Sequence, residues 1–112
     1  MKANELRIGN IVSTWNGIKM KLDEDDLEIM FGARNYEDFY PIPLTPEILE
    51  KCGFEKSSFT QWRDNYFTLT DIDTKYLFCK SESIEVIATI QYLHQLQNLY
   101  FALTGNELNI NL

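Results

Sequence analysis

The spacing of apolar residues near the C-terminal end predicts one long helix. Between residues 90 and 104 these side chains recur at helical spacing and cover an arc of about 200°, whereas a typical surface helix has an apolar arc of about 100°. The arc comprises Ile90, Tyr92, Leu93, Leu96, Leu99, Tyr100, Phe101 and Leu103. Thr89 is expected to cap the start of the helix, and Gly105 is expected to follow its end.

One face of a sheet is too narrow for such an arc, so other elements are expected to cover its flanks. Candidates are a short helix at 46–52, the alternating apolar residues of 108–112, and a second copy of the chain. Because aromatic side chains are favoured at the centres of interfaces, Tyr92, Tyr100 and Phe101 are candidate contacts of a homodimer. The alternative is that strands and the C-terminal segment cover the arc within one chain.

Two polar residues on this helix are open to a functional and a structural interpretation. Gln97 interrupts the apolar arc, so it is a further candidate interface residue. A hydrogen bond to the backbone of a neighbouring strand or loop is the favoured alternative. His94 lies at the border of the polar side, where a partly exposed histidine is expected rather than a catalytic one, since no motif places it beside a nucleophile.

A β-hairpin is predicted near the N-terminal end. Asn16-Gly17 favours a two-residue type I′ turn between alternating strands. The cross-strand pairs that this turn implies are Trp15–Ile18, Ser13–Met20 and Ile11–Leu22.

A short helix is predicted over 46–52. Thr45 is a suitable cap, Pro46 suits the first helical position, and Gly53 suits the end. Its expected buried side is Ile48, Leu49 and Cys52, and Phe54 is expected to fold back onto the core. The prolines at 41 and 43 are expected to keep the preceding chain extended.

The segment 59–87 predicts an antiparallel meander. Asp64-Asn65 is a plausible turn that pairs Trp62 with Phe67, and further strands are expected at 76–80 and 84–87. The whole chain, 1–112, is therefore predicted to be a single α+β domain. About five or six antiparallel strands would form a twisted sheet, partly closed like a small barrel, with the short central helix and the long C-terminal helix packed on it.

Composition and charge exclude some classes of function. The chain has 112 residues, 45% of them hydrophobic, and a formal net charge of -7. This charge repels nucleic-acid phosphates, and neither half is basic, so no direct nucleic-acid contact is expected. No signal peptide or membrane span is recognised, and Cys52 and Cys79 lack a CxxC motif. A cytoplasmic protein with two free, buried thiols is expected.

No motif in the sequence assigns catalysis, a cofactor or a metal. Cys52, Cys79 and His94 are too few and too widely spaced for a zinc site. The acidic segment 23–26 is expected to be a solvated turn, and a cation site is the alternative. Trp62, Tyr66 and Tyr36 could form a stacking surface, but too few basic residues accompany them, so core or rim positions are expected.

Three strings in the chain carry a resemblance to a known group of proteins. They are “LRIGN” at 6–10, “IPLTPEILEKCGF” at 42–54 and “HQLQNLYFALTGNEL” at 94–108. Together they resemble a group of small uncharacterised proteins from Bacteroides-type gut bacteria and their phages, whose members end in a string of the last kind. The resemblance implies a phage, prophage or mobile-element context and carries over no activity and no catalytic residue.

Three functions follow from these observations, in decreasing order of support. The first is a small non-enzymatic interaction or accessory protein, indicated by the missing catalytic motifs and the wide apolar helix. The second is an acidic mimic of nucleic acid that inhibits a host protein, which predicts carboxylates concentrated on one surface. The third is an enzyme or small-molecule binder, which predicts a deep pocket with convergent polar groups.

Overall fold

The computed structural model describes residues 6–14, 17–22, 39–81 and 85–111, and these residues adopt an α+β fold. The chain forms two compact units. The first comprises Met1–Pro43 and Tyr92–Glu107, and the second comprises Leu44–Gln91 and Leu108–Leu112. The predicted fold class is confirmed, with the strands divided between two sheets instead of one. That 1–112 is one domain stays a prediction.

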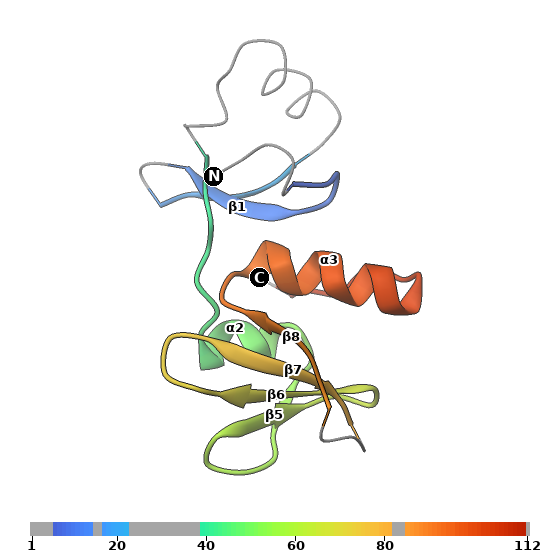
Figure 1. The fold of residues 1–112 in the computed structure, drawn as a ribbon. Coiled ribbons are helices and arrows are strands. Elements are labelled where there is room, and N and C mark those ends of the chain that lie inside the picture. The colour runs from blue at the N-terminus through green and yellow to red at the C-terminus, as the bar shows by residue number, and fades with distance from the viewer. Residues whose placement is uncertain (1–5, 15–16, 23–38, 82–84, 112) are drawn as a thin grey trace. The chain divides into compact units, whose positions relative to one another are not determined.

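The first unit contains a three-stranded antiparallel sheet with the order β2-β1-β3. Its strands are β1 (Ile11–Thr14), β2 (Lys19–Lys21) and β3 (Phe39–Tyr40). The helix α3 (Leu93–Thr104) packs against β1, which runs along it in Figure 1.

The β1–β2 hairpin has a longer loop than the two-residue turn predicted at Asn16-Gly17. The N–H of Thr14 donates to the carbonyl of Ile18 at 2.8 Å, so residues 15–17 lie between the two bonded positions. Gly17, the last of them, has φ of 84°. Glycine adopts such a positive φ without strain. Trp15 and Asn16, and with them the predicted pair Trp15–Ile18, lie outside the described residues.

The strand register therefore differs by one residue from the prediction. Met20 pairs with Val12, not with Ser13. A shift of one residue turns a strand over, because successive side chains point to opposite faces. Val12 is accordingly the fully buried residue of β1, at 0% exposure, whereas Ile11 and Ser13 are half-buried.

Helix α3 starts later than predicted. Thr89 is not its cap but lies in the preceding strand, β8 (Val86–Ile90), where it pairs with Leu77. The run of β-branched residues in β8 favours a strand and extends it to Ile90. Tyr92 is the N-cap residue, and its N–H donates to Oε1 of Gln95 at 3.1 Å. The predicted end is confirmed, since Gly105 has φ of 74° and its N–H donates to the carbonyl of Phe101.

The second unit contains a five-stranded antiparallel sheet in the order β4-β5-β6-β7-β8. Before β8 come β4 (Glu55–Lys56), β5 (Gln61–Arg63), β6 (Phe67–Asp71) and β7 (Tyr76–Lys80). Strands β5 to β8 lie side by side in Figure 1, and the sheet is open: its edge strands, β4 and β8, do not pair, so the described strands form no barrel.

One face of this sheet is the core of the second unit. Trp62 pairs with Leu69, which pairs with Phe78, and all three are at most 4% exposed. Phe67 packs against Phe78 with 4.6 Å between ring centroids. The predicted face is therefore confirmed, but the predicted pairing of Trp62 with Phe67 is wrong by two residues, an even shift that leaves both rings on the same side.

The reason for that shift lies in the β5–β6 turn. Oδ1 of Asp64 accepts the N–H groups of Tyr66 and Phe67 at 2.8 and 2.7 Å. The N–H of Asp64 donates to the carbonyl of Phe67 at 3.0 Å. Aspartate is favoured as the first residue of a turn because its side chain bonds the backbone ahead. The central residues are therefore Asn65 and Tyr66, one position later than predicted.

The short helix α2 (Pro46–Lys51) agrees with its prediction. The hydroxyl of Thr45 accepts the N–H of Ile48 at 3.3 Å, and Gly53 follows with φ of 89°. Leu49 and Phe54 are buried, at 0% and 1% exposure. The segment 108–111 does not form a strand: Leu108 is buried, and the N–H of Asn111 donates to the carbonyl of Lys51 at 2.8 Å.

Neither of the two helices within the described ranges is long and apolar enough to cross a membrane.

Candidate functional site

Gln97, one of the four candidate interface residues on α3, is buried and bonded to the chain. It is 2% exposed. Its Oε1 accepts the N–H of Ile11 at 2.8 Å, and its Nε2 donates to the carbonyl of Gly9 at 3.0 Å. The amide thus satisfies backbone groups at the start of β1, and the favoured structural interpretation of Gln97 is confirmed.

The three aromatic candidates differ in exposure. Tyr92 and Tyr100 are half-buried, and Phe101 is 39% exposed. The guanidinium of Arg7 lies over the Phe101 ring, 4.4 Å from its centroid, where a cation–π contact is favourable. A homodimer through these residues stays a prediction.

Arg7 is the centre of a polar network between the N-terminal segment and α3. It forms an ion pair with Glu107, in which both of its terminal nitrogens donate to the carboxylate. Its Nε donates to Oδ1 of Asn98 at 3.1 Å, and its Nη2 donates to the carbonyl of Gln97 at 3.3 Å. The planar guanidinium suits such a fixed, multidentate arrangement.

Asn10 completes this network from a fully buried position, at 0% exposure. Its Oδ1 accepts the N–H of Arg7 at 2.7 Å, and its Nδ2 donates to Oδ1 of Asn98 at 2.7 Å. We call Arg7, Asn10, Gln97, Asn98 and Glu107 the β1–α3 polar network. All five residues lie in two of the strings noted above, 6–10 and 94–108, so these strings form the two halves of one structural contact.

His94 does not have the partly exposed position that the sequence predicts. It is 1% exposed, and its ring stacks on Tyr92 with 6.0 Å between centroids and an angle of 10°. The helix wheel places His94 at the border of the polar side, and Gln97 and Asn98, three and four residues further along, bond to Ile11 and Asn10. Polarity alone therefore does not indicate exposure on this helix.

Both cysteines are free and buried, as predicted. Burial raises the pKa of the Cys52 thiol from 9.0 to about 12. Because the thiolate is the reactive form, a thiol with so high a pKa is inert as a nucleophile at neutral pH. The described residues contain no group of three or more His, Cys, Asp or Glu side chains placed to hold a metal ion. The acidic segment 23–26 and Tyr36 lie outside the described residues.

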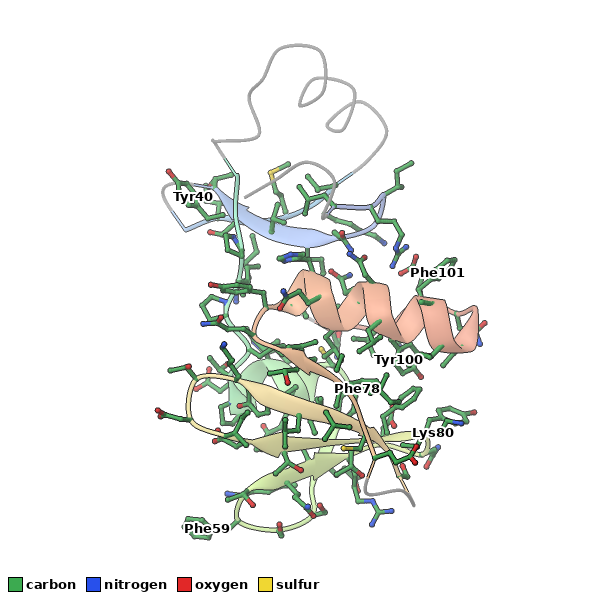
Figure 2. All side chains as sticks on the ribbon, in the orientation of Figure 1. Tyr40, Phe59, Phe78, Lys80, Tyr100 and Phe101 are labelled. Atoms are coloured by element: carbon green, nitrogen blue, oxygen red, sulfur yellow. The ribbon has the colours of Figure 1, made fainter. Side chains whose placement is uncertain are left out.

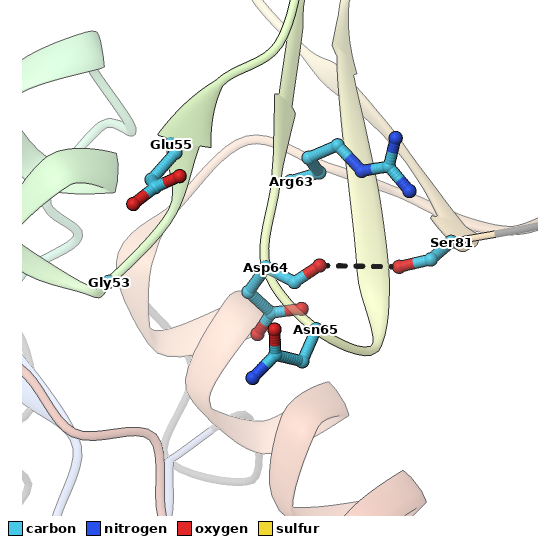
Figure 3. Close-up of a pocket in the computed structure, with 6 residues that line it drawn as sticks. All are labelled: Gly53, Glu55, Arg63, Asp64, Asn65 and Ser81. Atoms are coloured by element: carbon cyan, nitrogen blue, oxygen red, sulfur yellow. Dashed lines mark hydrogen bonds between the residues drawn. The ribbon is translucent and has the colours of Figure 1, made fainter.

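A polar pocket opens at one end of the five-stranded sheet, with a volume of about 510 Å³ (Figure 3). It is lined by Gly53, Glu55, Arg63, Asp64, Asn65 and Ser81. In Figure 3 the side chains of Glu55 and Arg63 point in opposite directions. Oδ1 of Asp64 is bound within the β5–β6 turn, and the Asp64 carbonyl accepts the Ser81 hydroxyl at 3.4 Å. The convergent polar groups expected of an enzyme are not found among these residues.

The most exposed large apolar side chain described is Phe59, in the loop between β4 and β5. It is 93% exposed, and Figure 2 shows its ring projecting away from the rest of the chain. The loop is held by backbone hydrogen bonds, since the N–H groups of Ser57 and Ser58 both donate to the carbonyl of Gln61, at 2.9 and 3.4 Å. The Phe59 ring is thus presented from an ordered loop.

Lys56 accompanies this ring. Its ammonium lies 5.3 Å from the ring centroid of Phe59 and 5.9 Å from that of Trp62. Trp62 beneath it is 4% exposed, so the lysine stem covers a core ring while its charge remains at the surface. Lys56 forms no ion pair with any other residue that the structure describes.

The β6–β7 loop lies directly beside this aromatic residue. The N–H of Asp71 donates to the carbonyl of Thr60 at 2.7 Å, and Ile72, the next residue, is 42% exposed. We call a set of exposed residues in these two loops and at the adjoining ends of β4 and β6 the hairpin-tip surface. It comprises Lys56, Phe59, Thr60, Asp71, Ile72, Asp73 and Lys75.

Sequence reasoning did not identify this surface. It weighed Trp62 and Tyr66 as a stacking surface and expected core or rim positions; the structure places Trp62 in the core, as expected, and leaves Tyr66 60% exposed. The available signal was Phe59 itself, an aromatic residue within a run of Ser and Thr between two strands, where turn residues are normal.

No known protein family, curated protein or solved structure matches this chain.

Proposed function

We propose that this chain is a small non-enzymatic interaction or accessory protein that acts through the hairpin-tip surface. The observation that carries the proposal is the 93% exposure of Phe59 on a loop held by backbone hydrogen bonds. Rigid, exposed aromatic side chains are the commonest anchors of protein interfaces, because they bury a large area at low entropic cost.

The side chains that could perform chemistry are instead buried or hydrogen-bonded within the chain, which supports a non-enzymatic function. Gln97, Asn98 and Arg7 bond to one another's segments, and the Cys52 thiol is held in its neutral form. His94 is buried against Tyr92. Among the described residues, large exposed side chains are therefore better candidates for function than polar ones.

The resemblance of the end strings supports a phage, prophage or mobile-element origin, and the unpaired cysteines suit a reducing cytoplasm. The partner in that context would be a phage or host protein, or the chain itself.

A photo-cross-linking amino acid in place of Phe59 tests this function in a Bacteroides-type host. The matched control carries the same cross-linker in place of Tyr66, an exposed aromatic residue at the opposite end of β5. We expect a specific protein adduct from position 59, and its purified partner should bind the native chain and not the Phe59→Ala variant. Equal adducts from both positions, or none from position 59, would contradict the proposal.

A further inference from the structure

We infer that the hairpin-tip surface joins two copies of this chain, an inference that rests on the function proposed above. The surface presents two apolar side chains, Phe59 and Ile72, at 93% and 42% exposure. It also carries charges of both signs, so one copy offers each kind of group that the other copy needs.

The charges of this surface permit self-association. Two copies with a formal net charge of -7 repel each other on approach. On the hairpin-tip surface, Lys56 and Lys75 balance Asp71 and Asp73, so its own charges sum to zero. Opposite charges that face each other across an interface fix its register and exclude other partners.

The geometry allows these contacts to occur twice around a two-fold axis. Phe59 and Ile72 each lie one residue from the bonded pair Thr60 and Asp71, whose N–H to carbonyl distance is 2.7 Å. The two loops are therefore neighbours. In a two-fold pair, Phe59 of each copy packs on Ile72 of the other, and Lys56 of each copy faces Asp73 of the other.

Two loop tips form a small interface, so the dimer is expected to be weak and concentration-dependent. Sedimentation velocity of the full chain over a range of concentrations at about 0.15 M salt, where the net repulsion is screened, is the test. We expect reversible dimerisation, a dissociation constant raised at least about tenfold in Phe59→Ala, and no change in Tyr66→Ala. Circular dichroism verifies that each variant is folded.

A charge exchange makes the test specific for this pairing. Lys56→Glu alone should weaken the dimer, because two carboxylates then face each other. Adding Asp73→Lys to the same chain should restore it, since both ion pairs then form with reversed sign. Failure of that restoration in a folded double variant would overturn the proposed register.

Two other results would overturn the inference. One is a chain that stays monomeric at every concentration. The other is a dimer that Phe59→Ala leaves intact, and its disruption by Phe101→Ala would place the contact on α3. A monomer that still cross-links another protein through position 59 removes only this inference, whereas no adduct at position 59 removes the proposed function as well.

Discussion

The two units hold themselves together by different means. In the first, apolar residues such as Val12 and Leu96 are buried, but buried amides and an arginine also connect the start of β1 to α3, and Asn10 and Gln97 are at most 2% exposed. In the second, a row of apolar side chains across five strands forms the core, with Leu69 and Phe78 at 0% exposure. A hydrogen bond is lost when either partner is replaced, whereas an apolar core tolerates apolar substitutions that conserve its volume.

The exposed aromatic residues of the two units show the functional side of this difference. Phe101 lies under Arg7, whose guanidinium is already bound to Glu107 and Asn98. Phe59 lies beside Lys56, which has no ion-pair partner among the described residues. The first ring belongs to a completed structural contact, and the second remains available to a partner.

The largest effect is expected in the apolar core of the second unit. Phe78→Ala removes a fully buried ring that packs on Phe67, and such truncations lower the free energy of unfolding by about 3–5 kcal/mol. Urea denaturation measures this loss. A loss below about 1 kcal/mol would mean that the row of rings is not the core that holds this unit.

The next effect contrasts directional bonding with packing. Gln97→Met conserves volume but leaves the part-buried N–H of Ile11 and the buried carbonyl of Gly9 without their partner, at a total cost of about 1–3 kcal/mol. Leu69→Met, its control in the second unit, should cost less than about 1.5 kcal/mol. Equal costs in urea denaturation would remove the distinction between the units.

The dependence of stability on pH tests burial in the second unit. Because the folded state raises the pKa of Cys52 to about 12, only the unfolded state releases this proton above pH 9. The Cys52 contribution is thus fully present below pH 9 and is lost at about 1.4 kcal/mol per pH unit above it.

Cys52→Ala should flatten this alkaline decline in denaturation curves recorded between pH 8 and pH 11. Tyr76 contributes in the same direction at higher pH, because burial and Asp71 raise its pKa, so some decline should remain. An unchanged slope in the variant would contradict the assignment of the effect to Cys52.

The smallest effect compares the two exposed rings directly. Phe101→Ala should lower the free energy of unfolding by about 1 kcal/mol, because it removes the contact with Arg7 and a partly buried ring. Phe59→Ala should change it by less than about 0.5 kcal/mol, as expected of a surface residue. A larger stability loss at Phe59 would make its role structural.

Local signals in the sequence were sufficient for some elements and not for others. Thr45, Pro46 and Gly53 predicted α2 correctly, because a cap and a terminator act within a few residues. The predicted position of the β5–β6 turn is wrong by one residue. The side chain of Asp64 selects the turn by accepting the N–H groups of Tyr66 and Phe67, and composition does not reveal these bonds.

The candidate site was partly predictable. The backbone bonds of Gln97 were expected, since an amide within an apolar arc needs a partner, but its partners, Ile11 in β1 and Gly9 before this strand, are 86 and 88 residues away. The predicted exposure of His94 was wrong because polar positions on the helix were assumed to face solvent. Phe59 was missed because its importance lies in its exposure, which depends on how the β4–β5 loop is held.

The most direct test of the account follows the two rings together by ¹⁹F NMR. The chain carries 4-fluorophenylalanine, the resonances of Phe59 and Phe101 are assigned by substitution, and spectra are recorded with excess unlabelled chain and with host extract. We expect the Phe59 resonance to shift or broaden in at least one mixture while the Phe101 resonance stays in place. Movement of Phe101 alone, or of neither ring, would contradict it.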